Sequence, residues 1–286
     1  MLFIGYFYCR GGRVRSNAID SGSITLGLQG FKSLPLHLRD IMKNKKKKKT
    51  NLIKAIIFDV DNTLIDFMKM KQKAVRSGVA AMVAAGLPMK QLEAECEVWR
   101  LYERYGYEYQ TVFQKMLKKR MGKVDYSILA PGVIAYRRKK EGFLISYPGV
   151  YETLDILKKR GYKLGVLSDA PRIQVWLRLA AMNLHKMFDV VVTFDDTGKR
   201  KLRSLIPFKK AIEKLKVPPE KIVMIGDSIE RDIRGANSLG MKTVLAKYGD
   251  DGSFCRLRKK ADFEITNFAE IIDAINYFES AADADE

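Results

Sequence analysis

AIIFDVDNTLIDF, residues 55–67, joins a short apolar run to two carboxylates that follow it directly. The apolar run, which begins as IKAIIF at residue 53, predicts a strand that is buried on both faces. Asp59 and Asp61 stand at its end, where two anions so close together repel each other. A sequence that only had to fold has little reason to place them there, so the stretch predicts a chemical role for both carboxylates.

The rest of the chain predicts an α/β fold. Apolar strands are expected at residues 163–167, 190–194, 221–225, 243–246 and 263–265, and helices at residues 151–160, 173–182, 207–215, 230–239 and 268–278. Such alternation is typical of a doubly wound parallel sheet, a Rossmann-like core covered by helices on both faces. Residues from about 66 to 142 are helical instead, with breaks near Gly86, Gly106 and Gly122.

We therefore expect three parts. Residues 1–50 form a basic leader, residues 51–65 and 147–286 form the core, and residues 66–146 form an inserted α-helical cap domain. The leader carries 11 Lys or Arg against two acidic residues, which is nearly half of the net charge of +19. A run of like charge such as KNKKKKK at residues 43–49 is typical of a solvated, disordered tail, and the alternative is a nucleic-acid-binding or targeting segment. Met42 precedes this run, and one hypothesis is that translation starts there.

The bulk composition excludes several classes of protein. No apolar run approaches the roughly 18 residues that span a bilayer, so no membrane partner is expected. The three cysteines are widely spaced and form no CxxC pair, which argues against a disulfide framework or a cysteine zinc site and fits a reducing, cytoplasmic setting. The sequence does not fix the oligomeric state.

Polar residues follow other predicted strands as well. Ser168 ends GVLSDA and Asp227 ends VMIGD, with Asp232 five residues beyond it and Lys201 after the third core strand. Each residue alone has an ordinary explanation, such as a helix cap, a turn or a solvated side chain. The carboxyl ends of parallel strands meet at one edge of the sheet, however, and the carboxylates gathered there would require a cation or a proton.

Oxygen ligands without histidine or cysteine favour Mg²⁺. A site with Mg²⁺, a lysine, a hydroxyl and exposed backbone amides suits a phosphoryl group. One carboxylate of the Asp-x-Asp pair can attack phosphorus while the other transfers protons to and from the reacting oxygens. This division of labour gives a physical reason for two neighbouring carboxylates.

FDVDNTL, GVLSDA and VMIGDSIERDIRGANSLGM together resemble the haloacid dehalogenase (HAD) superfamily, most closely its phosphatase branch with a helical cap after the first strand, which includes phosphoglycolate phosphatases. The resemblance covers about residues 53–247. It implies that Asp59 is the nucleophile, that Asp61 is the general acid/base and contacts Mg²⁺ through its carbonyl, and that Thr63 supports their loop. It also implies that Ser168 binds phosphate and that Asp227 and Asp232 are the remaining acidic groups of the Mg²⁺ site. The family lysine is assigned to Lys201. Lys199 is the alternative, because GKRKLRSLIPF departs from the usual family pattern around this lysine.

The expected function is Mg²⁺-dependent hydrolysis of a small organic phosphate monoester through an aspartyl-phosphate on Asp59. A sugar-phosphate mutase of the same family is one alternative. Another is a non-catalytic or nucleic-acid-associated binding protein that is tethered by the basic leader. Asp61 argues against a dehalogenase. Phosphonate hydrolases of the family use a cap lysine, and the sequence gives none of these lysines a distinguishing context: Lys69, Lys71, Lys73, Lys90 and Lys115.

Overall fold

The structure is a computed structural model that describes residues 52–198, 202, 204–249 and 261–281. Its strands are β1 (Ala55–Phe58), β2 (Lys163–Leu167), β3 (Val190–Val192), β4 (Ile222–Gly226), β5 (Lys242–Ala246) and β6 (Phe263–Ile265). Its α-helices are α2 (Phe67–Ala84), α3 (Gln91–Tyr105), α4 (Val112–Met121), α5 (Tyr126–Gly142), α6 (Val150–Lys159), α7 (Arg172–Ala181), α8 (Ile206–Leu215), α9 (Arg234–Ser238) and α10 (Ile271–Ala281). The leader, Lys199 and Lys201 lie outside the described residues, so the expectations for them stay predictions.

All six strands are parallel and lie in the order β3-β2-β1-β4-β5-β6. The chain therefore winds outward from β1 in one direction and then returns to the other side of β1. Phe58 at the end of β1 lies opposite Val166 of β2 and Ile225 of β4, so these strands end nearly level. The expected α/β class with a doubly wound parallel sheet is confirmed, and the switch point lies between β1 and β4.

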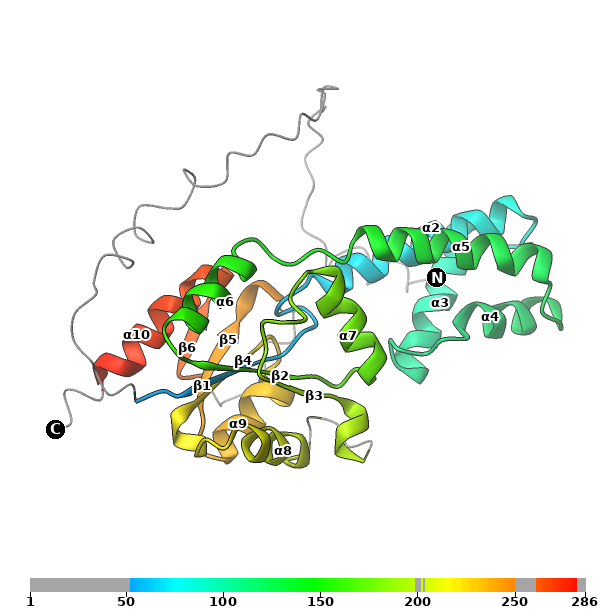
Figure 1. The fold of residues 1–286 in the computed structure, drawn as a ribbon. Coiled ribbons are helices and arrows are strands. Elements are labelled where there is room, and N and C mark those ends of the chain that lie inside the picture. Colours follow the sequence, from blue (N-terminus) through cyan, green and yellow to red (C-terminus); the bar gives the residue numbers. More distant parts are fainter. Residues whose placement is uncertain (1–51, 199–201, 203, 250–260, 282–286) are drawn as a thin grey trace, which may run out of the picture. The chain divides into compact units, whose positions relative to one another are not determined.

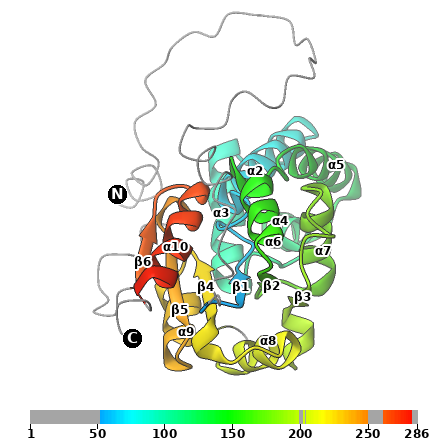
Figure 2. The same ribbon diagram turned by 60° about the vertical axis from the view of Figure 1, so that its left-hand side comes forward.

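Helices cover both faces of this sheet, and this explains why most residues of the strands are apolar. α6 and α10 lie on one face and α8 and α9 on the other (Figures 1 and 2). Ile57 of β1 belongs to the buried cluster that includes Phe208 of α8, whereas the neighbouring Phe58 stacks on Phe268 with ring centroids 5.9 Å apart. Successive residues of the strand thus pack on opposite layers.

Helices α2 to α5, here called the cap helices, lie between β1 and α6 in the chain. Their apolar faces enclose a core of their own, and α2 packs along α5. Two of the predicted breaks end helices, because Gly106 and Gly122 have φ angles of 89° and 74°, which favour glycine. The boundaries of a separate cap domain stay a prediction.

The chain after β4 differs from the predicted helix at residues 230–239. Ile229–Ile233 forms a π-helical turn before the short α9, and the amides of Asp232 and Ile233 both donate to the Ser228 carbonyl. Asp232 is the fourth residue of this wider turn. Among the described residues, none of the helices is long and apolar enough to cross a membrane.

Candidate active site

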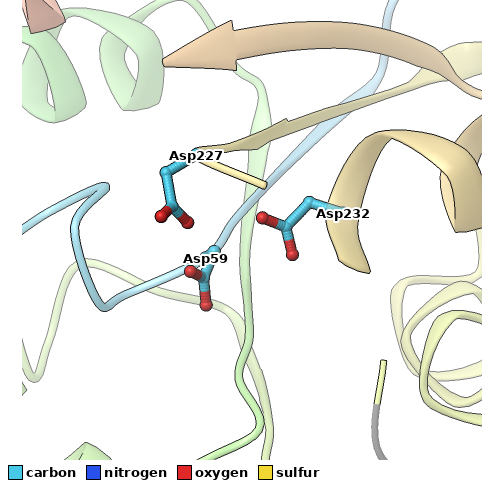
Figure 3. Close-up of side chains that lie close together, drawn as sticks. All are labelled: Asp59, Asp227 and Asp232. Carbon is cyan, nitrogen blue, oxygen red and sulfur yellow. The ribbon is translucent and has the colours of Figure 1, made fainter. Parts of the chain in front are cut away.

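Three carboxylates meet at the switch point of the sheet. Asp59 follows β1 and donates its amide to Ile225 at 2.9 Å, Asp227 follows β4, and Asp232 comes from the π-helical turn. Each offers an oxygen atom, and these three oxygens all lie within 4.8 Å of one another. Figure 3 shows the three side chains converging. The predicted meeting of Asp59, Asp227 and Asp232 at one edge is thus what the structure contains.

Asp232 is completely buried, although the sequence pattern alone favoured a solvated helical residue. Its Oδ2 accepts a hydrogen bond from the Ser228 amide at 3.0 Å, and its side chain packs on the backbone of Gly226. A Cβ atom at Gly226 would lie 2.4 Å from that oxygen, so the last residue of β4 must lack a side chain. The π-helical turn and this glycine together bring Asp232 to the other two carboxylates.

The pKa values of this cluster are raised because its carboxylates are buried beside one another. Burial, followed by the charge of Asp232, raises the pKa of Asp59 well above its usual range. The same two causes raise the pKa of Asp227 to about 7, and burial raises the pKa of Asp232. Among the described residues, Asp59 Oδ2 and Asp232 Oδ1 are buried and have no hydrogen-bond donor. These two oxygens could therefore be ligands of a cation.

Arg231 supplies part of the compensating positive charge. Its Nη2 lies 2.9 Å from Asp227 Oδ1 and 3.9 Å from Asp59 Oδ2. The sequence analysis did not identify this residue, because a charged residue in the first turn of a predicted helix is ordinarily solvated. The guanidinium offsets one of the three negative charges that the ionised carboxylates would carry.

Asp61 lies beside the cluster and is held by a different arginine. Arg178 of α7 contacts Asp61 Oδ2 through Nη1 at 2.9 Å, and through Nη2 it forms a short ion pair with Glu108. The Arg178 side chain is only 2 % exposed and its guanidinium lies 4.7 Å from the centre of the Phe67 ring. Asp61 Oδ1 has no hydrogen-bond partner within the described ranges. Burial raises the pKa of Asp61, and the positive charge of Arg178 opposes this shift.

Helical spacing carries a signal for Arg178 that the sequence analysis missed. Val175, Arg178 and Leu179 lie at positions i, i+3 and i+4 of α7, and all three are buried. A cation on an apolar stripe needs a buried partner, so the spacing indicates a functional or structural ion pair. The partner Glu108 lies in the loop of residues 106–111, and no pattern in the sequence predicts that contact.

Lys71 corrects the expectation that no cap lysine has a distinguishing context. It lies on the buried stripe of α2 and is 6 % exposed, with Nζ 4.2 Å from the centre of the Tyr102 ring. Nζ donates a hydrogen bond of 2.6 Å to the Tyr107 carbonyl. Burial lowers the pKa of Lys71 to about 8. Its contacts anchor the 106–111 loop on α2.

Thr63 and Ser168 complete the predicted set that the structure describes. Both are buried, and Thr63 Oγ1 has no hydrogen-bond partner among the residues that the structure describes. The Thr63 carbonyl accepts a hydrogen bond from the Tyr248 hydroxyl at 2.9 Å, which ties the Asp-x-Asp loop to the end of β5. Ser168 follows β2, and its Oγ accepts from the Ala170 amide at 3.2 Å. The hydroxyl of Ser168 thus stands at the same edge of the sheet as Asp59.

A cavity of about 640 Å³ lies between the cap helices and α7. Arg178, which contacts Asp61, forms part of its wall, and the cap helices α2, α4 and α5 supply much of the rest. Aromatic and cationic side chains are frequent in the lining, among them Phe67, Tyr102, Tyr136 and Lys140. Its volume falls in the range of small-molecule sites.

The fold and the acidic cluster at the switch point are those of an α/β enzyme. The sequence matches the family of haloacid dehalogenase-like hydrolases over residues 53–240, and the chain belongs to this family. It is similar to the glyceraldehyde 3-phosphate phosphatase of Pyrococcus furiosus, with 34 % identity over 78 % of this chain and 93 % of the relative. The Methanopyrus kandleri enzyme of the same name is 33 % identical over 78 % of this chain and 97 % of its own.

A solved structure agrees with these relatives. The HAD phosphatase from Thermococcus onnurineus is 27 % identical, with a TM-score of 0.53 over 78 % of this chain and 98 % of that protein. The expected enzyme class is confirmed, and the chain is a HAD-type phosphoric monoester hydrolase.

Proposed function

We propose that the chain hydrolyses a small organic phosphate monoester with Mg²⁺ as cofactor and through an aspartyl-phosphate on Asp59. The observation that carries the proposal is the convergence of Asp59, Asp227 and Asp232 at the switch point, with Asp61 beside them. A buried set of acids of this kind is costly to a fold, and it is explained if the site binds a cation and a phosphoryl group.

The residues present fit a divalent cation that prefers oxygen ligands. The three clustered carboxylates include two buried oxygens that accept no hydrogen bond from any described residue. Mg²⁺ would be held by Asp59, Asp227, Asp232 and the Asp61 carbonyl. Asp232 is the second carboxylate of the GDSIERD motif at residues 226–232. When bound, Mg²⁺ would offset the negative charge of the carboxylates and of the phosphoryl oxygens.

Asp59 performs the first chemical step in this proposal. A carboxylate oxygen of Asp59 attacks phosphorus, the bond from phosphorus to the ester oxygen breaks, and Asp61 gives its proton to the departing alcohol. Asp61 then takes a proton from a water molecule that attacks the aspartyl-phosphate. Inorganic phosphate leaves, Asp59 is restored as a carboxylate and Asp61 is protonated again.

The other predicted residues would orient the phosphoryl group. Ser168, buried directly after β2, would donate its hydroxyl to a phosphoryl oxygen. We assign the same task to Lys201, with Lys199 as the alternative. Thr63 would hold the Asp-x-Asp loop through its contact with Tyr248.

The substrate is proposed from two observations. The relatives that cover most of the chain are named for glyceraldehyde 3-phosphate, and the cavity is lined by Arg178, which contacts Asp61, the group that would protonate the leaving oxygen. We therefore propose glyceraldehyde 3-phosphate or a similar short phosphorylated carbonyl compound as the substrate. The organic part of the substrate would occupy the cavity.

The proposal is tested by phosphate release from glyceraldehyde 3-phosphate and from p-nitrophenyl phosphate, with Mg²⁺ and with a chelator. The wild type should turn over only with Mg²⁺, and Asp59→Asn should be inactive while remaining folded. Asp273→Asn, a substitution on the distant helix α10, serves as the matched control and should keep wild-type activity. Undiminished hydrolysis by Asp59→Asn, or by the chelator-treated wild type, would contradict the proposal.

A further inference from the structure

The Arg178 guanidinium lies between two carboxylates from different parts of the chain. Asp61 belongs to the loop after β1, and Glu108 belongs to the 106–111 loop between α3 and α4. Because the Arg178 side chain is 2 % exposed, these two carboxylates replace the water that would otherwise solvate the charge. The mechanism proposed above uses Asp61 but gives no role to either Arg178 or Glu108.

The two oxygens of Asp61 differ because of this arrangement. Oδ2 accepts a hydrogen bond from Arg178 Nη1, whereas Oδ1 accepts none from the part of the chain that the structure describes. An arginine that faces a single carboxylate commonly binds both of its oxygens through a pair of parallel hydrogen bonds. Here Nη2 is directed to Glu108 instead, so Arg178 holds Asp61 through one oxygen and leaves the other one available.

The 106–111 loop is fixed where it meets Arg178. Lys71 of α2 donates to the Tyr107 carbonyl at 2.6 Å, and its ammonium lies over the Tyr102 ring. The residue adjacent to Tyr107 is Glu108, whose side chain is about three-quarters buried. The anchored backbone thus presents the Glu108 carboxylate to Arg178, and the position of this loop determines whether the second half of the guanidinium is occupied.

We propose that Arg178 and Glu108 are positioning residues for Asp61: Glu108 draws one side of the Arg178 guanidinium away, so that Asp61 is oriented through Oδ2 and keeps Oδ1 free to protonate the leaving oxygen. This inference rests on the proposed function, because it needs Asp61 as the general acid. It adds that proton donation depends on a contact between α7 and the 106–111 loop. Without Glu108, Arg178 would take both oxygens of Asp61.

The test compares two esters that differ in their need for an acid. p-Nitrophenyl phosphate has a leaving group that departs with little help from a proton, whereas glycerol 3-phosphate releases an alkoxide unless it is protonated. Steady-state kcat and KM are measured with Mg²⁺ on the full chain for the wild type, Glu108→Ala, Glu108→Gln and Arg178→Lys. Asp61→Asn provides the reference for a lost acid, and Asp59→Asn tests the proposed function itself.

We expect Glu108→Ala to lower kcat for glycerol 3-phosphate by about tenfold or more and kcat for p-nitrophenyl phosphate by less than about threefold, as partial loss of an acid would. Asp61→Asn should show the same preference more strongly, since general acids contribute about 100-fold or more. Glu108→Gln should recover part of the loss, because its amide oxygen still accepts from Nη2. Arg178→Lys should resemble Glu108→Ala, and if it does not fold, the two Glu108 variants decide the question.

Glu97→Gln is the matched control. Glu97 is a cap carboxylate that is paired with Lys119 at 2.6 Å and with Arg100 at 3.0 Å. It does not line the cavity that Arg178 and Glu108 line. Its variant should change both substrates equally or not at all. Equal losses for the two esters in Glu108→Ala, or no loss, would overturn the inference while an inactive Asp59→Asn upholds the proposed function. Retained activity in Asp59→Asn would overturn the proposed function and the inference with it.

Discussion

Asp227 shows how burial beside other carboxylates changes the protonation of a single residue of the site. Burial and the neighbouring Asp232 raise its pKa to about 7, so near neutral pH the metal-free protein holds a proton that an exposed carboxylate would have released. Arg231 and a contact from Asn62 at 3.5 Å oppose this shift. Without a cation, the cluster is therefore an arrangement whose stability depends on protonation.

The metal-free protein should lose stability as the pH rises. The unfolded chain releases the Asp227 proton near its ordinary pKa of 3.8, whereas the folded protein keeps it until about pH 7. Folded molecules bind more protons between these values, so this contribution to the free energy of unfolding is complete below pH 3.8 and is lost through pH 7. Asp227→Asn removes this titration. The melting temperature of the variant should therefore rise relative to that of the wild type as the pH increases from 5 to 8.

Thermal unfolding of both proteins in a chelator, across that pH range, measures this effect. Adding Mg²⁺ should stabilise the wild type more than Asp227→Asn at pH 8. Parallel pH profiles for the two metal-free proteins would show that Asp227 does not keep its proton in the fold.

Arg231 should act as the internal counter-charge of the cluster. Arg231→Met removes a cation 2.9 Å from Asp227, so the metal-free protein should melt at a lower temperature at pH 7.5 and gain more from Mg²⁺ than the wild type. The control is Arg234→Met, because Arg234 is exposed and makes none of the ion pairs found among the described residues. Equal responses to Mg²⁺ in the wild type and in Arg231→Met would exclude this role.

At the scale of the elements, loops rather than strands set the geometry of the site. The strands bring Asp59 and Asp227 to one edge, but the π-helical turn aims Asp232, and the last residues of the 3₁₀ turn Lys247–Gly249 lie against the Asp-x-Asp loop. A Cβ atom on Gly249 would lie 1.8 Å from the Asn62 carbonyl oxygen and 3.0 Å from the Asp227 Cβ. The chain after β5 therefore approaches the loop at a distance that only glycine permits.

Gly249→Ala should displace the Asp-x-Asp loop. We expect the variant to lose roughly 1–3 kcal/mol of unfolding free energy, as overpacked sites do, and most of its phosphatase activity. Gly142→Ala is the matched control, since a Cβ at Gly142 meets nothing within 4 Å, and it should be neutral or slightly stabilising. Urea unfolding and phosphate release measure the two effects. Wild-type stability and activity in Gly249→Ala would contradict the packing described here.

Across the whole molecule, the sequence predicts the fold more completely than it predicts the polar contacts within the site. Periodicity and motif spacing place Asp59, Asp227 and Ser168 at strand ends, because the end of a strand follows from local sequence and parallel strands share an edge. The ion pair of Arg178 with Glu108 joins residues 70 positions apart. Local sequence patterns do not predict a contact over such a separation.

Local geometry accounts for the remaining differences. The burial of Asp232 depends on a π-helical turn of five residues. Such a turn is too short to show a period of its own in the sequence, so the pattern indicated an α-helix with a solvated residue. Lys71 and Arg178 did carry a signal, namely a cation within a buried helical stripe. That signal identifies a buried charge but leaves its partner unknown.

The central claim is that Asp59 becomes phosphorylated during turnover. The most direct measurement is mass spectrometry of the chain after mixing with excess glyceraldehyde 3-phosphate and Mg²⁺ and quenching in acid within one turnover, with the modified residue located by peptide sequencing. We expect one added phosphoryl group on Asp59, and we expect it to be absent from Asp59→Asn. Turnover without a phosphorylated chain, or a phosphoryl group on any residue other than Asp59, would contradict it.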